Sequence, residues 1–332
     1  MPVSFHAGWR VALLLVLAVG PFGCRSSFRR NGQGAEERAV AFLAHEVPAW
    51  SRKNGCFSCH NNGDAARALY AARRLGFKFA RTALVDTSRW LSQPSRWEHN
   101  RGDPGFSDQR LANLQFAAAL LAVEQTRPAA VASSLPAAAA RVVADQDSLG
   151  AWPIETQDSL GSPATYGTTL ATYTAWRVLM LEGSKPSRHA ANRAGEWLRR
   201  APMRNVPAAG ALLQFAMRDS HPSAPELRAR AFDFLHRAQT SDGGWGPYPA
   251  VPAEAFDTAV ALLALAELPR EPGLEVMIKR GRAYLLSLQL ADGSWPATTR
   301  PSGGESYAQK MSTTGWATQA LLVSGDSRPF TR

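Results

Sequence analysis

The sequence predicts an all-α protein built from about six repeated helical hairpins, and three observations favour this class. Hydrophobic residues make up 45% of the 332 residues and charged residues 19%, which supplies enough apolar material for a sizeable core. The background is rich in Ala, has few runs of β-branched residues and contains ten Trp, which argues against an all-β protein. A pattern centred on Trp also recurs along the chain, which is typical of repeat architectures.

The positive charge is spread along the chain and gathers only at Arg25, Arg29 and Arg30. The formal net charge is +10, from 37 Lys and Arg against 27 Asp and Glu. A dispersed excess of this kind does not form a basic stripe, so we expect no nucleic-acid partner. Three Cys are too few for a disulfide-stapled scaffold.

The first element in chain order is a short apolar segment near the N-terminus. Arg10 precedes an unbroken apolar run over residues 11–19, which is too short to cross a bilayer because a spanning helix needs about 20 residues. A positive start followed by such a run is typical of a secretory signal peptide, so we expect one over residues 1–23. The alternative is a buried N-terminal helix.

Cys24 follows this segment and resembles the lipidated cysteine of bacterial lipoproteins. Gly23 fits that pattern, whereas Pro21 stands where lipoprotein signals usually have Leu. Cys24 is therefore the candidate lipidation site, followed by a linker over residues 24–35. We expect the mature chain to be exported, either to the periplasm or to a membrane through a lipid anchor at Cys24.

The next feature is the motif Cys56-Phe57-Ser58-Cys59-His60, which has the C-x-x-C-H spacing of c-type haem attachment. Two thiols three positions apart can form thioethers to one haem, and the adjacent His60 can then bind the iron as an axial ligand. Haem c is attached outside the bacterial cytoplasm, which agrees with an exported chain. The motif therefore predicts covalent haem c at Cys56 and Cys59 and a redox partner for the protein.

Two alternatives remain for these three residues. The spacing of Cys56 and Cys59 is also that of a redox dithiol or a structural disulfide. A zinc half-site is the other alternative, although such a site would need two further Cys or His at short spacing.

Internal repeats determine the rest of the architecture. The segment from Phe234 to Trp245 matches the segment from Tyr284 to Trp295, and a weaker copy runs from Gln146 to Trp152. In all three copies the Trp lies six residues after a Gln, giving the pairs Gln146 and Trp152, Gln239 and Trp245, and Gln289 and Trp295. An aromatic residue followed by Leu occupies the corresponding position at Phe42, Trp90 and Trp197. The repeat units therefore start near residues 42, 90, 141, 197, 234 and 284.

Each unit is expected to form two helices joined by a turn. The second helix is apolar on most faces and should be buried, with the first helix shielding it. Asp64 and Asp257 precede two of these apolar stretches, and we interpret both as N-caps. Six hairpins form either an open solenoid or, if the ends meet, a closed (α/α)6 toroid. We assign this domain to residues 36–325, with the haem motif in its first repeat at 50–63 and a tail at 326–332.

The best-preserved repeat resembles the QW motif of squalene–hopene cyclases and protein prenyltransferase β-subunits. The matching residues are Arg280-Gly281-x-x-Tyr284-Leu285-x-x-x-Gln289-x-x-x-Gly293-x-Trp295. The resemblance implies a closed toroid with a central apolar cavity. It also implies that the repeat Gln and Trp side chains tie helix ends together and are structural.

The chemistry of those families is only partly matched. Squalene–hopene cyclases protonate an alkene with the middle acid of a D-x-D-D-T-A motif, and the corresponding segment here is 254–259, with Phe256 at the position of that acid. A Phe side chain has no proton to donate. The zinc ligands of the prenyltransferases are not matched either, because no Cys follows Cys59.

These observations lead to one main functional expectation and three alternatives, of which one, a carbohydrate-active α/α toroid, is permitted by the Trp-rich loops but has no motif of its own. The main expectation is an exported c-type haem protein that performs electron transfer or redox chemistry beside an apolar cavity. The first alternative is a terpenoid cyclase-like or prenyltransferase-like enzyme, or a protein that binds an isoprenoid-like ligand without haem. Glu305 and Asp158 are the candidate acids for such an enzyme. The second alternative is a scaffold in which Cys56 and Cys59 form only a disulfide.

Overall fold

The computed structural model describes residue 1 and residues 34–99, 109–126, 134–154, 160–163, 165–300 and 304–325. Contacts between Cα atoms divide the chain into residues 1–32 and residues 33–332, and every described helix belongs to the second unit. The predicted signal peptide, Cys24 and the C-terminal tail at 326–332 lie outside the described residues.

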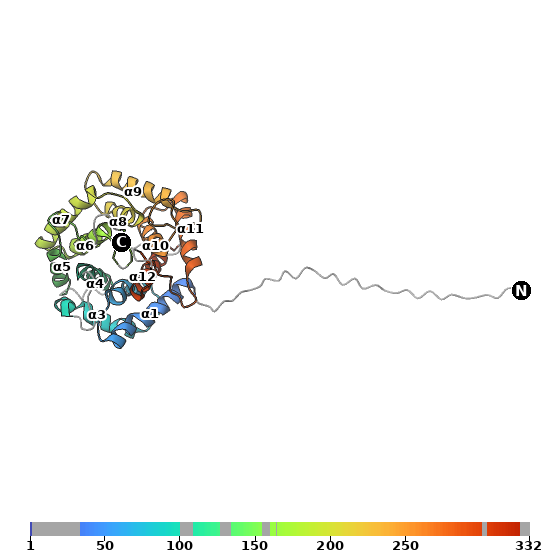
Figure 1. Ribbon diagram of the computed structural model, residues 1–332, viewed down its shortest axis with the longest axis horizontal. Coiled ribbons are helices and arrows are strands. Elements are labelled where there is room, and N and C mark those ends of the chain that lie inside the picture. Colours follow the sequence, from blue (N-terminus) through green and yellow to red (C-terminus); the bar gives the residue numbers. More distant parts are fainter. Residues whose placement is uncertain are drawn as a thin grey trace. The chain divides into compact units, whose positions relative to one another are not determined.

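Helices in the described part of the second unit form two concentric rings (Figure 1). The outer ring holds the first helix of each hairpin: α1 (Ala35–Asn54), α3 (Val85–Leu91), α5 (Leu135–Ala144), α7 (Lys185–Arg200), α9 (Ala224–Ala238) and α11 (Pro272–Leu288). Short 3₁₀ turns η2 (Arg81–Leu84) and η3 (Pro94–His99) flank α3. Each outer helix contains one of the predicted unit starts.

The inner ring holds the second helix of each hairpin. Its members are η1 (Cys59–Ala65) continuing into α2 (Ala66–Arg74), then α4 (Gln109–Glu124), α6 (Thr168–Glu182), α8 (Val206–Ala216), α10 (Ala255–Leu265) and α12 (Tyr307–Ser324). Neighbouring inner helices contact one another around the ring, and α12 returns to contact η1 and α2. The prediction of an all-α toroid of about six hairpins is therefore confirmed.

Sequence composition explains which helix lies inside. Every residue of α8 is buried, because its apolar and small side chains face neighbours on all sides. The outer helix α7 instead buries a narrow stripe that includes Ala190, Ala194 and Leu198, and its remaining faces are rich in Arg. Among the described residues, no helix combines the length and apolar character needed to span a membrane.

The repeated Gln and Trp side chains anchor the turn that follows an outer helix. The Trp bonds to that outer helix, and the Gln bonds to the next outer helix around the ring. The indole Nε1 of Trp245 donates to the carbonyl of Leu235 at 2.7 Å, and the amide of Gln239 donates to the carbonyl of Met277 at 2.9 Å, in the next outer helix. Trp152 and Trp295 make the equivalent bonds to Val142 and Leu285, and Gln146 and Gln289 reach Ala190 and Ala35.

The last of these bonds closes the ring, because Ala35 begins the first helix. The guanidinium of Arg282 reinforces the closure from α11. It pairs with Glu36 at 2.8 Å and donates to Ser324 Oγ at 3.0 Å, and so binds the first and last helices at once.

Candidate functional site

The first inner helix begins with a π-helix that is held tightly between its neighbours. A Cβ on Gly63 would lie 3.0 Å from Cβ of Gln115 in α4, and a Cβ on Gly315 in α12 would lie 2.9 Å from the carbonyl oxygen of Asp64. Glycine at both contacts lets the three segments approach closely. Short π-helical segments occur frequently at functional sites, so the side chains of η1 form the candidate site.

Asp64 is the centre of this site and is fully buried. Its Oδ2 accepts hydrogen bonds from Gln115 Nε2 and from Ser312 Oγ, both at 2.8 Å. Its Oδ1 accepts one from the hydroxyl of Tyr166 and pairs with Arg67 at 3.5 Å. Arg67 lies in α2, which continues η1, whereas Gln115 lies in α4, Tyr166 precedes α6 and Ser312 lies in α12. The tertiary fold therefore assembles the site.

Burial has a strong effect on the ionisation of this cluster. It raises the pKa of Asp64, while Arg67 and the donors Tyr166, Ser312 and Gln115 act in the opposite direction. Burial also raises the pKa of Tyr166 well above its ordinary value, and the charge of Asp64 adds to that effect. Tyr166 therefore stays a neutral hydrogen-bond donor to the carboxylate.

His60 joins the cluster through Ser312. Its Nδ1 lies 3.0 Å from Ser312 Oγ, which already donates its proton to Asp64. Ser312 must then accept from His60, so Nδ1 carries the proton and Nε2 keeps a free lone pair. Burial lowers the pKa of His60 to about 4, which keeps the imidazole neutral near pH 7.

The C-x-x-C-H segment lies between α1 and the inner ring, in the same type of outer-to-inner connection that elsewhere contains Trp245 and Trp295. Cys56 and Cys59 are both buried and are not joined in a disulfide. Cys59 and His60 lie within η1 rather than in a loop, because the helix begins at Cys59.

Two asparagines fix this segment in place. Asn61 donates to the hydroxyl of Tyr307 at 2.8 Å, and Asn62 donates to Thr87 Oγ1 at 2.8 Å. Asn62 Oδ1 also accepts from the backbone N–H of Ser58 at 3.0 Å.

The interpretation of Asp64 and Asp257 as N-caps is wrong. Asp64 lies inside η1, whose N-cap is Ser58, and Asp257 lies in the first turn of α10, whose N-cap is Glu254. Both carboxylates are fully buried and bind side chains of distant segments. An N-cap flanks the first turn of its helix, and neither residue has that position here.

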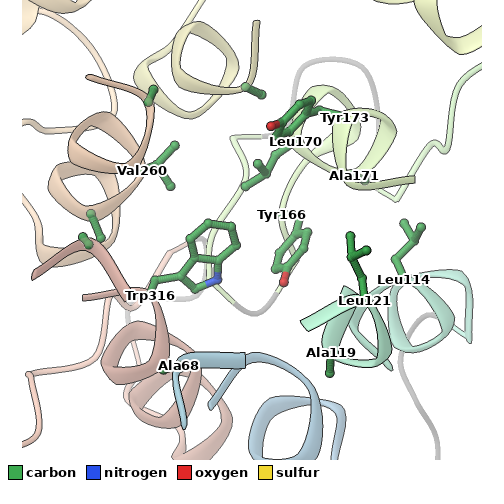
Figure 2. Close-up of a cluster of buried hydrophobic side chains, with 14 of the residues drawn as sticks. Ala68, Leu114, Ala119, Leu121, Tyr166, Leu170, Ala171, Tyr173, Val260 and Trp316 are labelled. Atoms are coloured by element: carbon green, nitrogen blue, oxygen red, sulfur yellow. The ribbon is translucent and has the colours of Figure 1, made fainter. Parts of the chain in front are cut away.

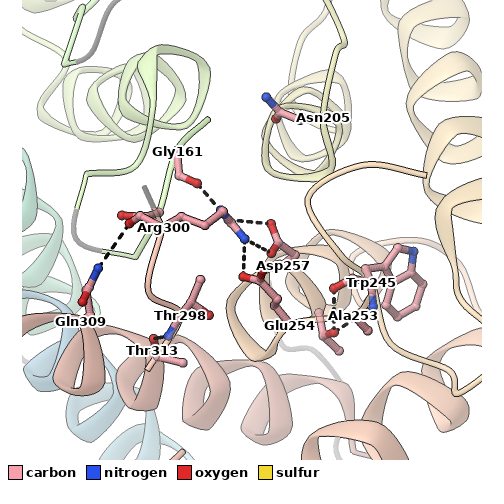
Figure 3. Close-up of polar contacts among 12 residues, drawn as sticks. Gly161, Asn205, Trp245, Ala253, Glu254, Asp257, Thr298, Arg300, Gln309 and Thr313 are labelled. Atoms are coloured by element: carbon pink, nitrogen blue, oxygen red, sulfur yellow. Dashed lines mark hydrogen bonds and ion pairs between the residues drawn. The ribbon is translucent and has the colours of Figure 1, made fainter. Parts of the chain in front are cut away.

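Asp257 forms the second buried polar group of the ring (Figure 3). Its two oxygens accept from the guanidinium of Arg300 at 2.8 and 3.1 Å, and the same guanidinium donates to Glu254 and to the carbonyl of Gly161. Burial raises the pKa of Asp257 to about 7, although Arg300 acts in the opposite direction. Arg300 thereby joins three of the segments that precede inner helices.

Apolar side chains from the inner helices converge in the middle of the ring (Figure 2). Trp316 lies at the centre. Its ring centroid is 5.4 Å from that of Tyr166 and 5.6 Å from that of Phe256, and both pairs pack edge to face. Around them Figure 2 shows Ala68 of α2, Leu121 of α4 and Val260 of α10. A central cavity remains a prediction, while the inward apolar surface that such a cavity needs is present.

Sequence reasoning missed most of this polar cluster. Gln115, Tyr166 and Ser312 are far apart in the sequence and share no motif. Of the acids proposed from the sequence, Glu305 is exposed, and Asp158 lies outside the described residues. Within the described ranges, no three His, Cys, Asp or Glu side chains gather to hold a metal ion.

The architecture is that of a terpene cyclase-like α/α toroid fold. Three solved structures share the fold over 87% of this chain. A type II terpene cyclase from Scytonema in complex with geranylgeranyl dihydroxybenzoate has a TM-score of 0.55 at 14% identity, with 96% of its chain covered. The same cyclase with merosterolic acid A has a TM-score of 0.54 at 15% identity, with 95% covered. A protein from Actinoplanes has a TM-score of 0.56 at 17% identity, with 98% covered.

The sequence comparison is more specific for the C-terminal part. Residues 201–330 match the squalene-hopene cyclase C-terminal domain. The drimenyl diphosphate synthase of Streptomyces showdoensis is 39% identical over 75 residues, which is 22% of this chain. That match spans only 14% of the length of the synthase.

Proposed function

We propose that this toroid binds an isoprenoid-like hydrophobic ligand among the side chains of its inner helices. The observation that carries the proposal is the convergence of apolar side chains around Trp316 and Tyr166, with one buried carboxylate, Asp64, bonded directly to Tyr166. Buried apolar surface with a few polar groups is the ordinary composition of a small-molecule site. The substrate and product of the Scytonema cyclase support this ligand class by analogy of fold.

The proposal excludes the usual proton donor of squalene–hopene cyclases. Phe256 occupies its position and packs on Trp316 instead. Both oxygens of the adjacent Asp257 are bound by Arg300, and both oxygens of Asp64 are bound by side-chain donors. These contacts oppose the rise in pKa that burial causes at each carboxyl group. With Phe256 at the position of the usual acid, the residues support ligand binding more directly than cyclisation.

Ligand binding can be tested with the purified full chain and farnesol, followed by intrinsic Trp fluorescence and by native mass spectrometry. We expect saturable binding with one molecule per chain. Ala171→Leu adds volume to the apolar cluster of Figure 2 and should weaken binding at least tenfold. Ala140→Leu, on an exposed face of α5, is the matched control. Absence of saturable binding in the folded wild-type protein would refute the proposal.

A second candidate function, covalent haem binding at Cys56 and Cys59, is favoured by the contacts of His60. An axial His commonly donates its Nδ1 proton to a protein acceptor, which leaves Nε2 for the metal. The His60–Ser312 contact has this arrangement, and both thiols lie within the same segment. The donor set thus fits haem c, which would supply one-electron redox chemistry when bound. Ser312 and Asp64 would then hold the imidazole in one tautomer and orientation.

The haem proposal is tested by a pyridine haemochrome assay on protein exported in a host that matures c-type cytochromes. A c-type spectrum that disappears in Cys56→Ala/Cys59→Ala would support it. An exported, folded protein without the spectrum would refute it and leave the thiols as a dithiol or disulfide.

Export and lipid attachment are proposed together with the haem. The support is the apolar run at residues 11–19 and Cys24. Cell fractionation tests export. Labelling with palmitate tests lipid attachment, because Cys24→Ala should abolish the label. Wild-type protein that stays in the cytoplasm would refute the proposal.

A further inference from the structure

Two buried polar atoms beside Asp64 have no hydrogen-bond partner among the described residues. They are the Nε1 of Trp316, a donor, and the Oε1 of Gln115, an acceptor. Both side chains are more than nine-tenths buried. A buried polar atom without a partner is unfavourable, so each of these two atoms needs an explanation.

A chain of contacts inside the ring links the two side chains. Gln115 bonds to Asp64, Asp64 bonds to Tyr166, and the Tyr166 ring packs on Trp316. In Figure 2 the indole nitrogen of Trp316 and the hydroxyl of Tyr166 lie at the same, lower end of the two rings. The orientation of the Gln115 amide is fixed because its nitrogen must face the carboxylate, which only accepts.

A hydroxyl carries both of the functions that these atoms need. It can donate to an acceptor such as Gln115 Oε1 and accept from a donor such as Trp316 Nε1. A carbonyl or an ether satisfies only Trp316, and an ammonium satisfies only Gln115.

The charges around Asp64 select against a phosphate or diphosphate. A phosphate would face the carboxylate of Asp64, which repels it. Arg67 does not offset this repulsion, because it is already paired with Asp64, donates to the Tyr166 hydroxyl at 3.2 Å and lies over the Trp316 ring at 5.0 Å.

We infer that the ring interior recognises the hydroxyl of a neutral isoprenoid-like alcohol through Gln115 and Trp316. This inference rests on the proposed ligand-binding function and specifies its ligand class. The apolar cluster around Trp316 binds the hydrocarbon, and Gln115 and Trp316 bind the alcohol end.

The test measures the affinity of the full-length protein for four probes with the same carbon skeleton: farnesol, farnesyl methyl ether, farnesene and farnesyl diphosphate. We expect farnesol to bind roughly tenfold more tightly than its methyl ether, because the ether leaves Gln115 without a donor. Farnesene and the diphosphate should bind more weakly still.

Two variants connect the preference to its residues. Gln115→Met should make the affinities for farnesol and its methyl ether equal. Trp316→Phe should reduce the difference in affinity between the methyl ether and farnesene. Trp90→Phe is the matched control because Trp90 is also buried with an unpartnered Nε1, yet belongs to outer helix α3. Circular dichroism and thermal melts establish that each variant is folded.

The possible outcomes separate this inference from the function on which it rests. If the wild-type protein binds all four probes with affinities that agree within twofold, the inference is overturned, since water then satisfies the two atoms. The proposed hydrophobic binding would stand in that case. Tightest binding of the diphosphate would also overturn it. If none of the probes binds, the proposed function fails as well.

Discussion

Asp257 and Arg300 bind each other out of solvent, with Asp257 fully buried and the Arg300 side chain 14% exposed. Replacing Asp257 by Asn leaves a buried guanidinium with weaker partners. We expect Asp257→Asn to lower the free energy of unfolding by about 3–5 kcal/mol, measured by urea denaturation. The control is Asp233→Asn, which removes an exposed ion pair with Arg237 and should cost less than about 1 kcal/mol. Equal losses in the two variants would contradict the buried role of Arg300.

His60 provides a prediction on pH dependence. Its pKa is about 4 in the folded protein and 6.5 for an ordinary His, so the unfolded chain binds the proton more tightly. The contribution of His60 to stability is complete above pH 6.5 and is lost as the pH falls towards 4. Relative to His60→Gln, the wild-type protein should therefore lose on the order of 3 kcal/mol across that interval.

The measurement is a series of denaturation curves between pH 4 and 7.5. His45→Gln is the control, because the His45 side chain is 80% exposed. Wild type and His60→Gln with parallel pH profiles would show that the imidazole is not held neutral in the folded protein.

At the scale of an element, the turn between α11 and α12 depends on Gly293. This residue has φ of +92°, and a Cβ there would lie 2.4 Å from the carbonyl oxygen of Arg38. Gly293→Ala should lower the unfolding free energy by more than about 1 kcal/mol through backbone strain and the displaced contact with α1. Gly273→Ala, in α11 with open space around it, should be neutral or slightly stabilising. A thermal melt of each variant checks both expectations.

The same turn shows what the sequence can predict and what it cannot. Trp295 bonds to a carbonyl ten residues earlier and Gln289 to one four residues later, so the repeat has local spacing that is visible in the sequence. Apart from Arg67, the partners of Asp64 lie 51, 102 and 248 residues away in the sequence. No local pattern encodes that assembly. An acid next to an apolar run has the sequence pattern of a cap, although Asp64 and Asp257 are buried partners of distant side chains.

At the scale of the whole molecule, the contacts form a closed circuit of helices. Six described hairpins follow one another around the ring, and Gln289 and Arg282 connect the last hairpin to the first. Each hairpin therefore has two neighbours, which removes the exposed ends that an open stack of repeats would need to cap. This closure explains why α12 can supply Ser312 and Trp316 to a site that begins at Cys59.

Arg282 binds both Glu36 and Ser324, so the two ends of the ring lie beside one guanidinium and the order of the hairpins has no preferred starting point. A circular permutant tests this consequence. Residue 325 would be joined to residue 34 by a short Gly-Ser linker, and new termini would be opened between Ser220 and His221, in the exposed connection of α8 and α9. We expect this permutant to unfold cooperatively with a helical spectrum like that of the parent ring. Opening the chain instead between Gly243 and Gly244 should prevent folding, because it cuts the turn that Gln239 and Trp245 hold together.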